Sequence, residues 1–107
     1  MSFLHRPLGL KAPHPSKAEG QRHMARVAEL PCVCCGRPGP SEVHHCISGR
    51  YSQRRNNDLE TIPLCAAHHR TGPLAIHASK REWEAEYGMD HEYLALVADW
   101  LAGEISE

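Results

Sequence analysis

The 107-residue chain contains few aromatic residues and no long run of apolar residues. Aromatic residues make up 6% of the sequence, and a domain of this size with so little core material often needs a metal or a disulfide to stabilise it. No apolar segment reaches the roughly 20 residues that a membrane-spanning helix requires. No glycine-rich phosphate loop and no Ser/His/Asp arrangement stands out. The sequence therefore gives no sign of a membrane protein, a phosphate-loop enzyme or a serine-type hydrolase.

Basic residues are missing from the end of the chain, because no Lys or Arg follows Arg81. Residues 1–81 hold all 12 basic residues and five of the 13 acidic ones, a formal charge of +7, and the other eight acidic residues follow. A strongly basic region suits a polyanionic partner such as DNA or RNA. The alternative, which charge alone does not separate from the first, is two solvated faces of opposite sign that dock on each other.

The five cysteines indicate metal ligation, because their number is odd and no signal peptide precedes them. We therefore expect a reduced, cytoplasmic compartment. Cys32-x-x-Cys35 and Cys65-x-x-His68 have the spacing of tetrahedral zinc ligands. Four protein ligands leave no open position, so this Zn²⁺ is predicted to be structural. Cys34 is an alternative ligand, and the competing interpretation is that some of the thiols are small buried groups.

The chain is expected to form one domain, residues 16–107, preceded by a flexible basic arm, residues 1–15. Ser16 and Glu19 have the spacing of a capping box, which predicts a helix that ends before Pro31. Two short strands and a short helix are predicted to follow, over residues 42–48, 59–64 and 65–70.

The C-terminal part, about residues 79–102, is predicted to form two helices. A second capping-box pattern, Ser79 to Glu82, would open the first of them, and Gly88 would close it. Asp90 would cap the second. The order of elements predicts an α+β fold in which helices flank a strand–loop–strand–helix unit.

A second group of polar residues lies among the zinc ligands: His44-His45, Asn57-Asp58 and His69. In their order, the motifs resemble those of the HNH (ββα-metal) endonuclease superfamily. The matching pieces are Cys32-x-x-Cys35, Val43-His44-His45, Asn57-Asp58-Leu59 and Leu64-Cys65-x-x-His68-His69. Residues 68–77 are more narrowly similar to the recombination-enhancement-function nucleases and their relatives in phages and prophages. The resemblance covers roughly residues 30–88, and it implies a small zinc-stabilised ββα-metal fold with flanking N- and C-terminal helices.

The resemblance also implies roles for the histidines. His45 matches the general base of the family, and His44 and His69 match ligands of a catalytic divalent cation, Mg²⁺ or Mn²⁺. Many family members carry a further His where this chain has Pro73, and His77 is the nearby substitute, which a loop would have to bring back. Strict alternation along a strand points neighbouring side chains to opposite faces, so both strand histidines reach one site only if the strand bends or ends there.

The family's Asn is displaced in this chain. Asp58 stands at the family's position, directly before Leu59, and Asn57 comes one residue earlier. Two roles follow as alternatives: Asp58 could ligate the cation directly, or Asn57 could orient His45 through a hydrogen bond.

Four arginines are expected to contact the phosphates of a nucleic acid, although an arginine-rich loop is more often simply solvated. They are Arg50, Arg54, Arg55 and Arg70.

The function that we expect is a divalent-metal-dependent DNA endonuclease with a His general base. The resemblance implies a role in phage or prophage recombination or DNA processing and a possible link to a recombinase filament. We also expect a location in the bacterial cytoplasm, no membrane, and a monomer or weak dimer. The main alternative is a non-catalytic zinc-binding module that binds nucleic acid or a protein. A third hypothesis is an accessory factor whose acidic C-terminal helices bind a partner.

Overall fold

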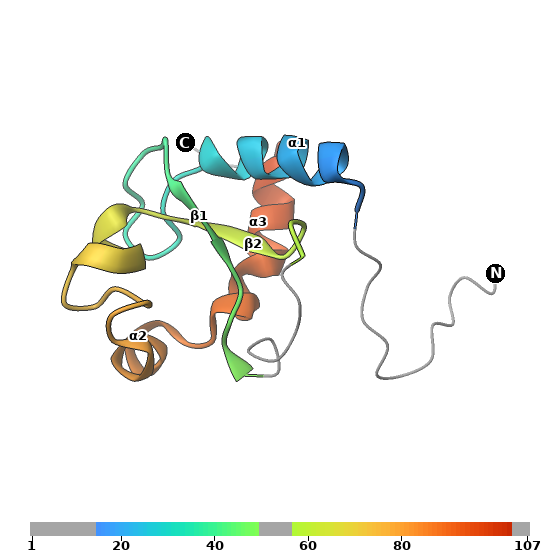
Figure 1. The fold of residues 1–107 in the computed structure, drawn as a ribbon. Helices are drawn as coiled ribbons and strands as arrows, with labels where there is room; N and C mark the ends of the chain where they lie inside the picture. Colours follow the sequence, from blue (N-terminus) through green and yellow to red (C-terminus); the bar gives the residue numbers. More distant parts are fainter. Residues whose placement is uncertain (1–14, 50–56, 104–107) are drawn as a thin grey trace.

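A two-stranded antiparallel sheet and the helices around it make up the α+β structure seen in the computed structural model, which describes residues 15–49 and 57–103 (Figure 1). The elements follow in the order α1 (Lys17–Ala28), β1 (Glu42–His45), β2 (Thr61–Leu64), η3 (Ala67–Thr71), α2 (Lys80–Tyr87), η4 (Asp90–Tyr93) and α3 (Leu94–Leu101). The predicted arm therefore lies outside the described residues, apart from its last residue, and so do Arg50, Arg54 and Arg55. No helix in the two described ranges is long and apolar enough to cross a membrane.

Helix α1 begins as the sequence predicted. Ser16 Oγ accepts a hydrogen bond from the Glu19 amide at 3.1 Å, and the Glu19 carboxylate accepts one from the Ser16 amide at 3.0 Å, which confirms the capping box. The helix buries Gly20 and Val27 and ends before Pro31.

Both strands are shorter than predicted, for reasons that lie in their hydrogen bonds. The strands pair from Glu42 opposite Leu64 to His45 opposite Thr61. Beyond β1, the amides of Ile47 and Ser48 donate to the carboxylate of Asp90 and not to β2. Residues 57–60 before β2 form a turn, so the second strand begins only at residue 61.

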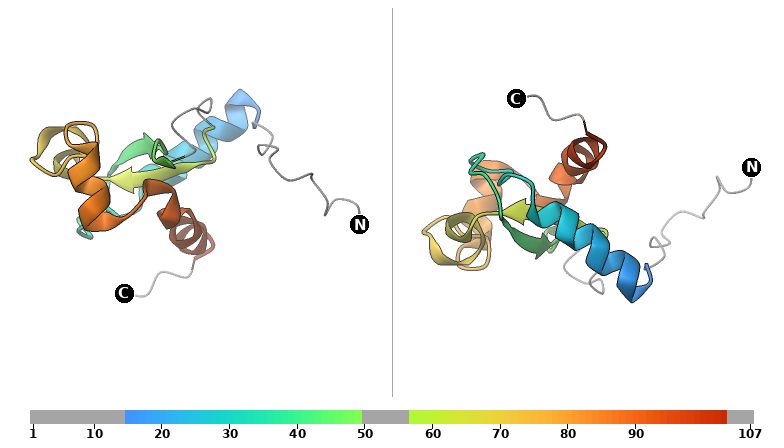
Figure 2. Two further views of the ribbon diagram at one scale, coloured as in Figure 1. Left: turned by 90° about the horizontal axis from the view of Figure 1, so that it is seen from below. Right: turned by 90° about the horizontal axis from the view of Figure 1, so that it is seen from above.

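The core lies around β2, all four residues of which are buried. Helices α1 and α3 both contact this strand. Val27 and Val97 are buried on these helices, and Ile62 and Leu64 are buried on β2. Figure 2 shows η3 and α2 together at one end of the structure, away from the start of α1. Trp83 is fully buried, as expected for a core residue.

Two predicted helix caps are wrong, although the helices themselves form. Ser79 precedes α2 but makes no capping hydrogen bond through its side chain. Asp90 opens the 3₁₀ turn η4, and its side chain does not cap it. The Asp90 carboxylate instead points to β1 and the residues after it, where it meets the ring of His44 and two backbone amides, so tertiary contacts replace the local one.

Candidate metal centres

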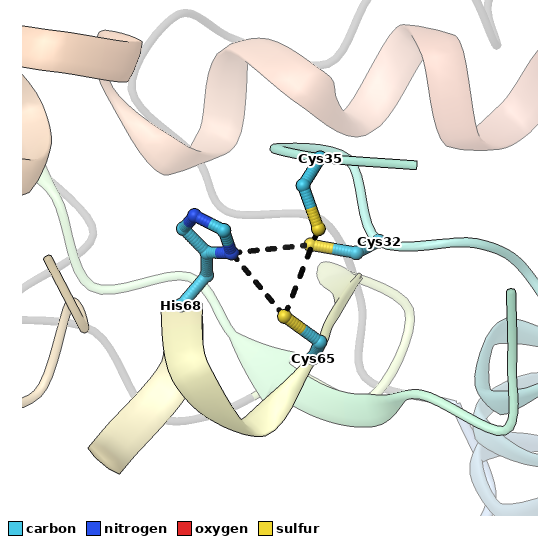
Figure 3. A group of neighbouring side chains, drawn as sticks. All are labelled: Cys32, Cys35, Cys65 and His68. Carbon is cyan, nitrogen blue, oxygen red and sulfur yellow. Dashed lines mark hydrogen bonds between the residues drawn. The ribbon is translucent and has the colours of Figure 1, made fainter. Parts of the chain in front are cut away.

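Three cysteines and one histidine converge where the loop after α1 meets the start of η3 (Figure 3). Their ligand atoms all lie within 4.8 Å of one another. Cys35 Sγ and Cys65 Sγ are 3.8 Å apart, and His68 Nδ1 lies 3.2 Å from Cys65 Sγ and 4.0 Å from Cys32 Sγ. Zn–S bonds of about 2.3 Å at tetrahedral angles put two sulfur atoms about 3.8 Å apart. The four residues predicted as ligands could therefore hold a structural metal ion.

The loop that carries the first two cysteines is shaped by its backbone. The Gly36 amide donates to the Cys32 carbonyl at 2.8 Å, and Gly36 takes a positive φ of 77°, which a glycine adopts without strain. The Val33 amide donates to the Pro63 carbonyl at 3.1 Å and so fastens the loop to β2. The turn at Gly36 and the hydrogen bond to β2 together fix the loop beside η3.

Cys34 lies beside this group but is not part of it. Its amide is 3.4 Å from Cys32 Sγ and donates to it. Hydrogen bonding from the Cys34 side chain is the main influence that lowers the pKa of the Cys32 thiol, and the same interaction raises the pKa of Cys34. The distances between ligand atoms place Cys35 and not Cys34 among the four.

The histidine of the group also forms a hydrogen bond through its other ring nitrogen. His68 Nε2 forms a hydrogen bond with Tyr87 Oη at 3.1 Å, which leaves Nδ1 to face the sulfur atoms. The Tyr93 hydroxyl in turn donates to the Tyr87 carbonyl at 2.7 Å. Helix α2 and η4 therefore orient a ligand that lies on η3. Sequence reasoning missed Tyr87, and no spacing or motif marks it.

Three histidines form a second group. His44, His69 and His77 have ligand atoms within 4.8 Å of one another, so they too could hold a metal ion. Their ring centroids are 4.7 to 5.2 Å apart. His44 is buried, His69 is partly buried and His77 is exposed, so the group opens to solvent on one side. Neighbouring residues of η3, His68 and His69, thus serve two different groups.

The chain after η3 folds back and so brings His77 to this group. The short helix predicted over residues 65–70 is a five-residue π-helix that begins at Ala67 and ends at Thr71. The Gly72 amide donates to the Ala67 carbonyl, and the His77 amide donates to the His69 carbonyl, each at 3.1 Å. A side chain on Gly72 would collide with the Ala67 carbonyl, so the close return of the chain requires glycine here.

Carboxylates orient two of the three histidines. His44 Nε2 lies 2.8 Å from Asp90 Oδ2, and His69 Nδ1 lies 2.8 Å from Glu42 Oε1. Burial is the main cause that lowers the pKa of His69 and of His77, which favours the neutral imidazole that a metal requires. The sequence did not predict that these carboxylates contact the histidines; it assigned Glu42 only to a strand and Asp90 only to a helix cap.

His45 is not a member of the three-histidine group. Its Nε2 lies 2.9 Å from Asp58 Oδ1, and both side chains are about one-third exposed, at 29% and 31%. Asp58 packs against Gly20 of α1 so closely that a side chain on Gly20 would collide with it. The buried Asn57 accepts a hydrogen bond from the Leu59 amide at 2.9 Å. Asp58 thus makes the contact to His45 that the sequence offered to Asn57, and Asn57 shapes the turn.

Arg70 is the one predicted phosphate contact within the described ranges. Its guanidinium pairs with both carboxylate oxygens of Glu42, at 2.7 to 3.0 Å, and remains 58% exposed. The hydrogen bonds from Arg70 are the main cause that lowers the pKa of Glu42. Arg70 therefore supports the carboxylate that orients His69.

Comparison with known proteins gives a family and no individual relative. None of the curated proteins and none of the solved structures matches the chain. A family model described as "Protein of unknown function (DUF968)" matches residues 5–102, which include both groups of candidate metal ligands. Because this match spans nearly the whole sequence, the chain belongs to the DUF968 family.

Proposed function

We propose that the chain is a divalent-metal-dependent DNA endonuclease of the HNH type, with a structural Zn²⁺ on its cysteine-rich group. The proposal rests on one observation: in each of the two His-His pairs, the neighbouring histidines contact different groups of residues. In η3, His68 joins the cysteines and His69 joins the second group; in β1, His44 joins the second group and His45 pairs with Asp58. A purely structural zinc module has no need of the second group or of the oriented His45.

The second group fits a divalent cation in its donor chemistry. His44, His69 and His77 offer three nitrogen ligands and leave other coordination positions open on the exposed side of His77. A cation bound there would supply charge stabilisation to a phosphodiester and to its leaving oxygen. Three imidazole nitrogens suit a transition-metal ion better than Mg²⁺, which prefers oxygen ligands, so of the two expected ions the donor set favours Mn²⁺.

His45 is assigned the role of general base. When its Nε2–H donates to Asp58, its Nδ1 carries the free lone pair and can accept a proton from a water molecule. Asp58 keeps the ring in this tautomer and orientation, as a carboxylate partner does for other catalytic histidines. The partial exposure of both side chains leaves the base open to solvent and to a nucleic acid.

DNA is the proposed substrate, and the formal charge of +7 over residues 1–81 supports a polyanion. Arg50, Arg54 and Arg55 remain proposed phosphate contacts, and Arg70 can share its exposed side with a phosphate. A phage or prophage role in the bacterial cytoplasm and a recombinase partner are parts of the same proposal, supported by the resemblance alone. The alternative function is a non-catalytic zinc-binding module for nucleic acid or protein.

Nicking of supercoiled plasmid tests the proposal. Wild-type protein should nick DNA when Mn²⁺ or Mg²⁺ is added and stop when EDTA removes it, and His45→Ala should lower the rate by about 10²–10⁴-fold. The variant, purified in the same way and checked for unchanged zinc content, controls for contaminating nucleases. Equal nicking by both proteins would remove His45 from the mechanism, and no nicking by either, on single- or double-stranded DNA, would favour the binding module.

A further inference from the structure

Asp90 is a fully buried carboxylate that contacts both the ring of His44 and the backbone after β1. Its Oδ2 lies 2.8 Å from His44 Nε2 and accepts a hydrogen bond from the Ile47 amide at 2.7 Å, and its Oδ1 accepts one from the Ser48 amide at 3.1 Å. His91 Nδ1 lies farther away, 3.8 Å from Oδ1. Two backbone donors hold the carboxylate in place, and the oxygen that faces His44 is therefore fixed in direction.

The backbone of Asp90 makes a further hydrogen bond to the segment after β1. The Asp90 amide donates to Ser48 Oγ at 3.3 Å, and Ser48 Oγ donates to Glu84 Oε2 at 2.7 Å. Hydrogen bonds thus run in both directions between the segment after β1 and the turn before α3, and we call this set of hydrogen bonds a clasp. Such a clasp limits rotation of the Asp90 side chain, because any rotation breaks at least one buried hydrogen bond.

The other ring nitrogen of His44 has no such partner. His44 Nδ1 is buried and makes no hydrogen bond to any residue of the described ranges. A buried polar atom without a partner costs free energy, so its presence in a well-packed site needs a reason. The rings of His69 and His77 lie against His44, with centroids 5.2 and 5.1 Å away. A metal ion shared by the three histidines would satisfy this nitrogen.

We propose that Asp90 is a positioning residue for the second metal group: it holds His44 as the Nε2–H tautomer and thereby presents Nδ1 as a ligand. The inference rests on the proposed function, since it assumes that a cation binds the three histidines. Metal-bound histidines commonly donate their second ring nitrogen to a carboxylate, which fixes the tautomer and strengthens the ligand. The C-terminal segment is then part of the metal site, although Asp90 lies 46 residues after His44.

The tautomer can be measured without a variant and without any assay of activity. Long-range ¹H–¹⁵N NMR spectra of the ring nitrogens distinguish the two neutral forms of each histidine. In protein that carries only the Cys/His-bound ion, His44 should be protonated at Nε2 and bare at Nδ1. Protonation at Nδ1 would overturn the inference, because Asp90 would then not set the ligand. This measurement holds even if variants of Asp90 fail to fold.

Mn²⁺ titration of Asp90→Asn by calorimetry tests the consequence. Loss of the carboxylate should weaken Mn²⁺ binding about 10–100-fold, with the zinc content unchanged. Ser48→Ala is the matched control, because it removes hydrogen bonds of the same clasp without touching His44, and it should bind Mn²⁺ within about twofold of wild type. Equal weakening in both variants would assign Asp90 a structural role only. If wild-type protein bound no Mn²⁺, the proposed cation site itself would fail, whatever the tautomer of His44.

Discussion

Gly72→Ala is the substitution whose effect the structure predicts most sharply. Gly72 follows η3, and its amide bonds the Ala67 carbonyl at 3.1 Å. An added Cβ would lie well inside contact distance of the same carbonyl oxygen and 3.2 Å from the carbonyl carbon. Both obstacles are backbone atoms, so no flexible side chain can move aside. The turn that returns His77 to His69 must open for the new methyl group to fit.

The cost follows from two contributions. Forcing an extra methyl group into a packed site costs about 1–3 kcal/mol, and losing one backbone hydrogen bond costs about 1 kcal/mol. We expect Gly72→Ala to lower the free energy of unfolding by about 2–4 kcal/mol, a large share of the roughly 5–15 kcal/mol typical of a domain. The second group should lose affinity for a metal ion as well, because His77 is the candidate ligand that this turn carries.

Urea unfolding and Mn²⁺ calorimetry on the same variant measure both effects. Gly103→Ala is the matched control: Gly103 has a φ of 88°, so alanine there is strained by about 1–2 kcal/mol, but an added Cβ would meet nothing within 4 Å, and Gly103 belongs to neither group of candidate ligands. Gly103→Ala should therefore lower stability and leave Mn²⁺ binding intact. A loss below about 0.5 kcal/mol in Gly72→Ala, or unchanged Mn²⁺ binding, would refute the reasoning about this turn.

Three further substitutions test other contacts. Cys65→Ser should abolish metal binding at the cysteine-rich group and, with it, cooperative thermal unfolding, whereas Cys46→Ala, which alters a buried thiol outside that group, should keep the metal. Gly20→Ala should displace Asp58 and slow any plasmid nicking at least tenfold despite a gain of roughly 1 kcal/mol in helix propensity; unchanged nicking would show that the contact to Asp58 is dispensable. Tyr87→Phe should lower stability by about 1 kcal/mol and weaken zinc retention against a chelator, and equal retention by wild type and variant would contradict its orienting role.

Much of the metal-binding arrangement could be predicted because it is encoded locally. Two residues between Cys32 and Cys35 allow one tight turn, and the spacing from Cys65 to His68 puts both on one side of a helical turn. The sequence prediction placed both strand histidines at one site; in the structure His44 joins the three-histidine group and His45 pairs with Asp58.

The residues that orient these ligands could not be predicted in the same way. Asp90, Tyr87 and Glu42 contact candidate ligands that lie 46, 19 and 27 residues away in the sequence. No helical or strand periodicity in the sequence therefore indicates these contacts. Asp90 precedes a helix and has a capping residue type, which favours the wrong local interpretation. The backbone of Ile47 and Ser48 competes for the same carboxylate and prevails, because buried amides need an acceptor where β1 ends.

The most direct test of the two-site account is a count of bound ions by native mass spectrometry. Protein purified with Zn²⁺ and then supplied with Mn²⁺ should carry two ions per chain, and His69→Ala should carry one, with the thiol-bound Zn²⁺ retained. His69 is chosen because it neighbours His68, a candidate zinc ligand, on η3 but belongs to the other group. A single ion in the wild-type protein, unchanged in His69→Ala, would contradict the second metal site and the nuclease mechanism that depends on it.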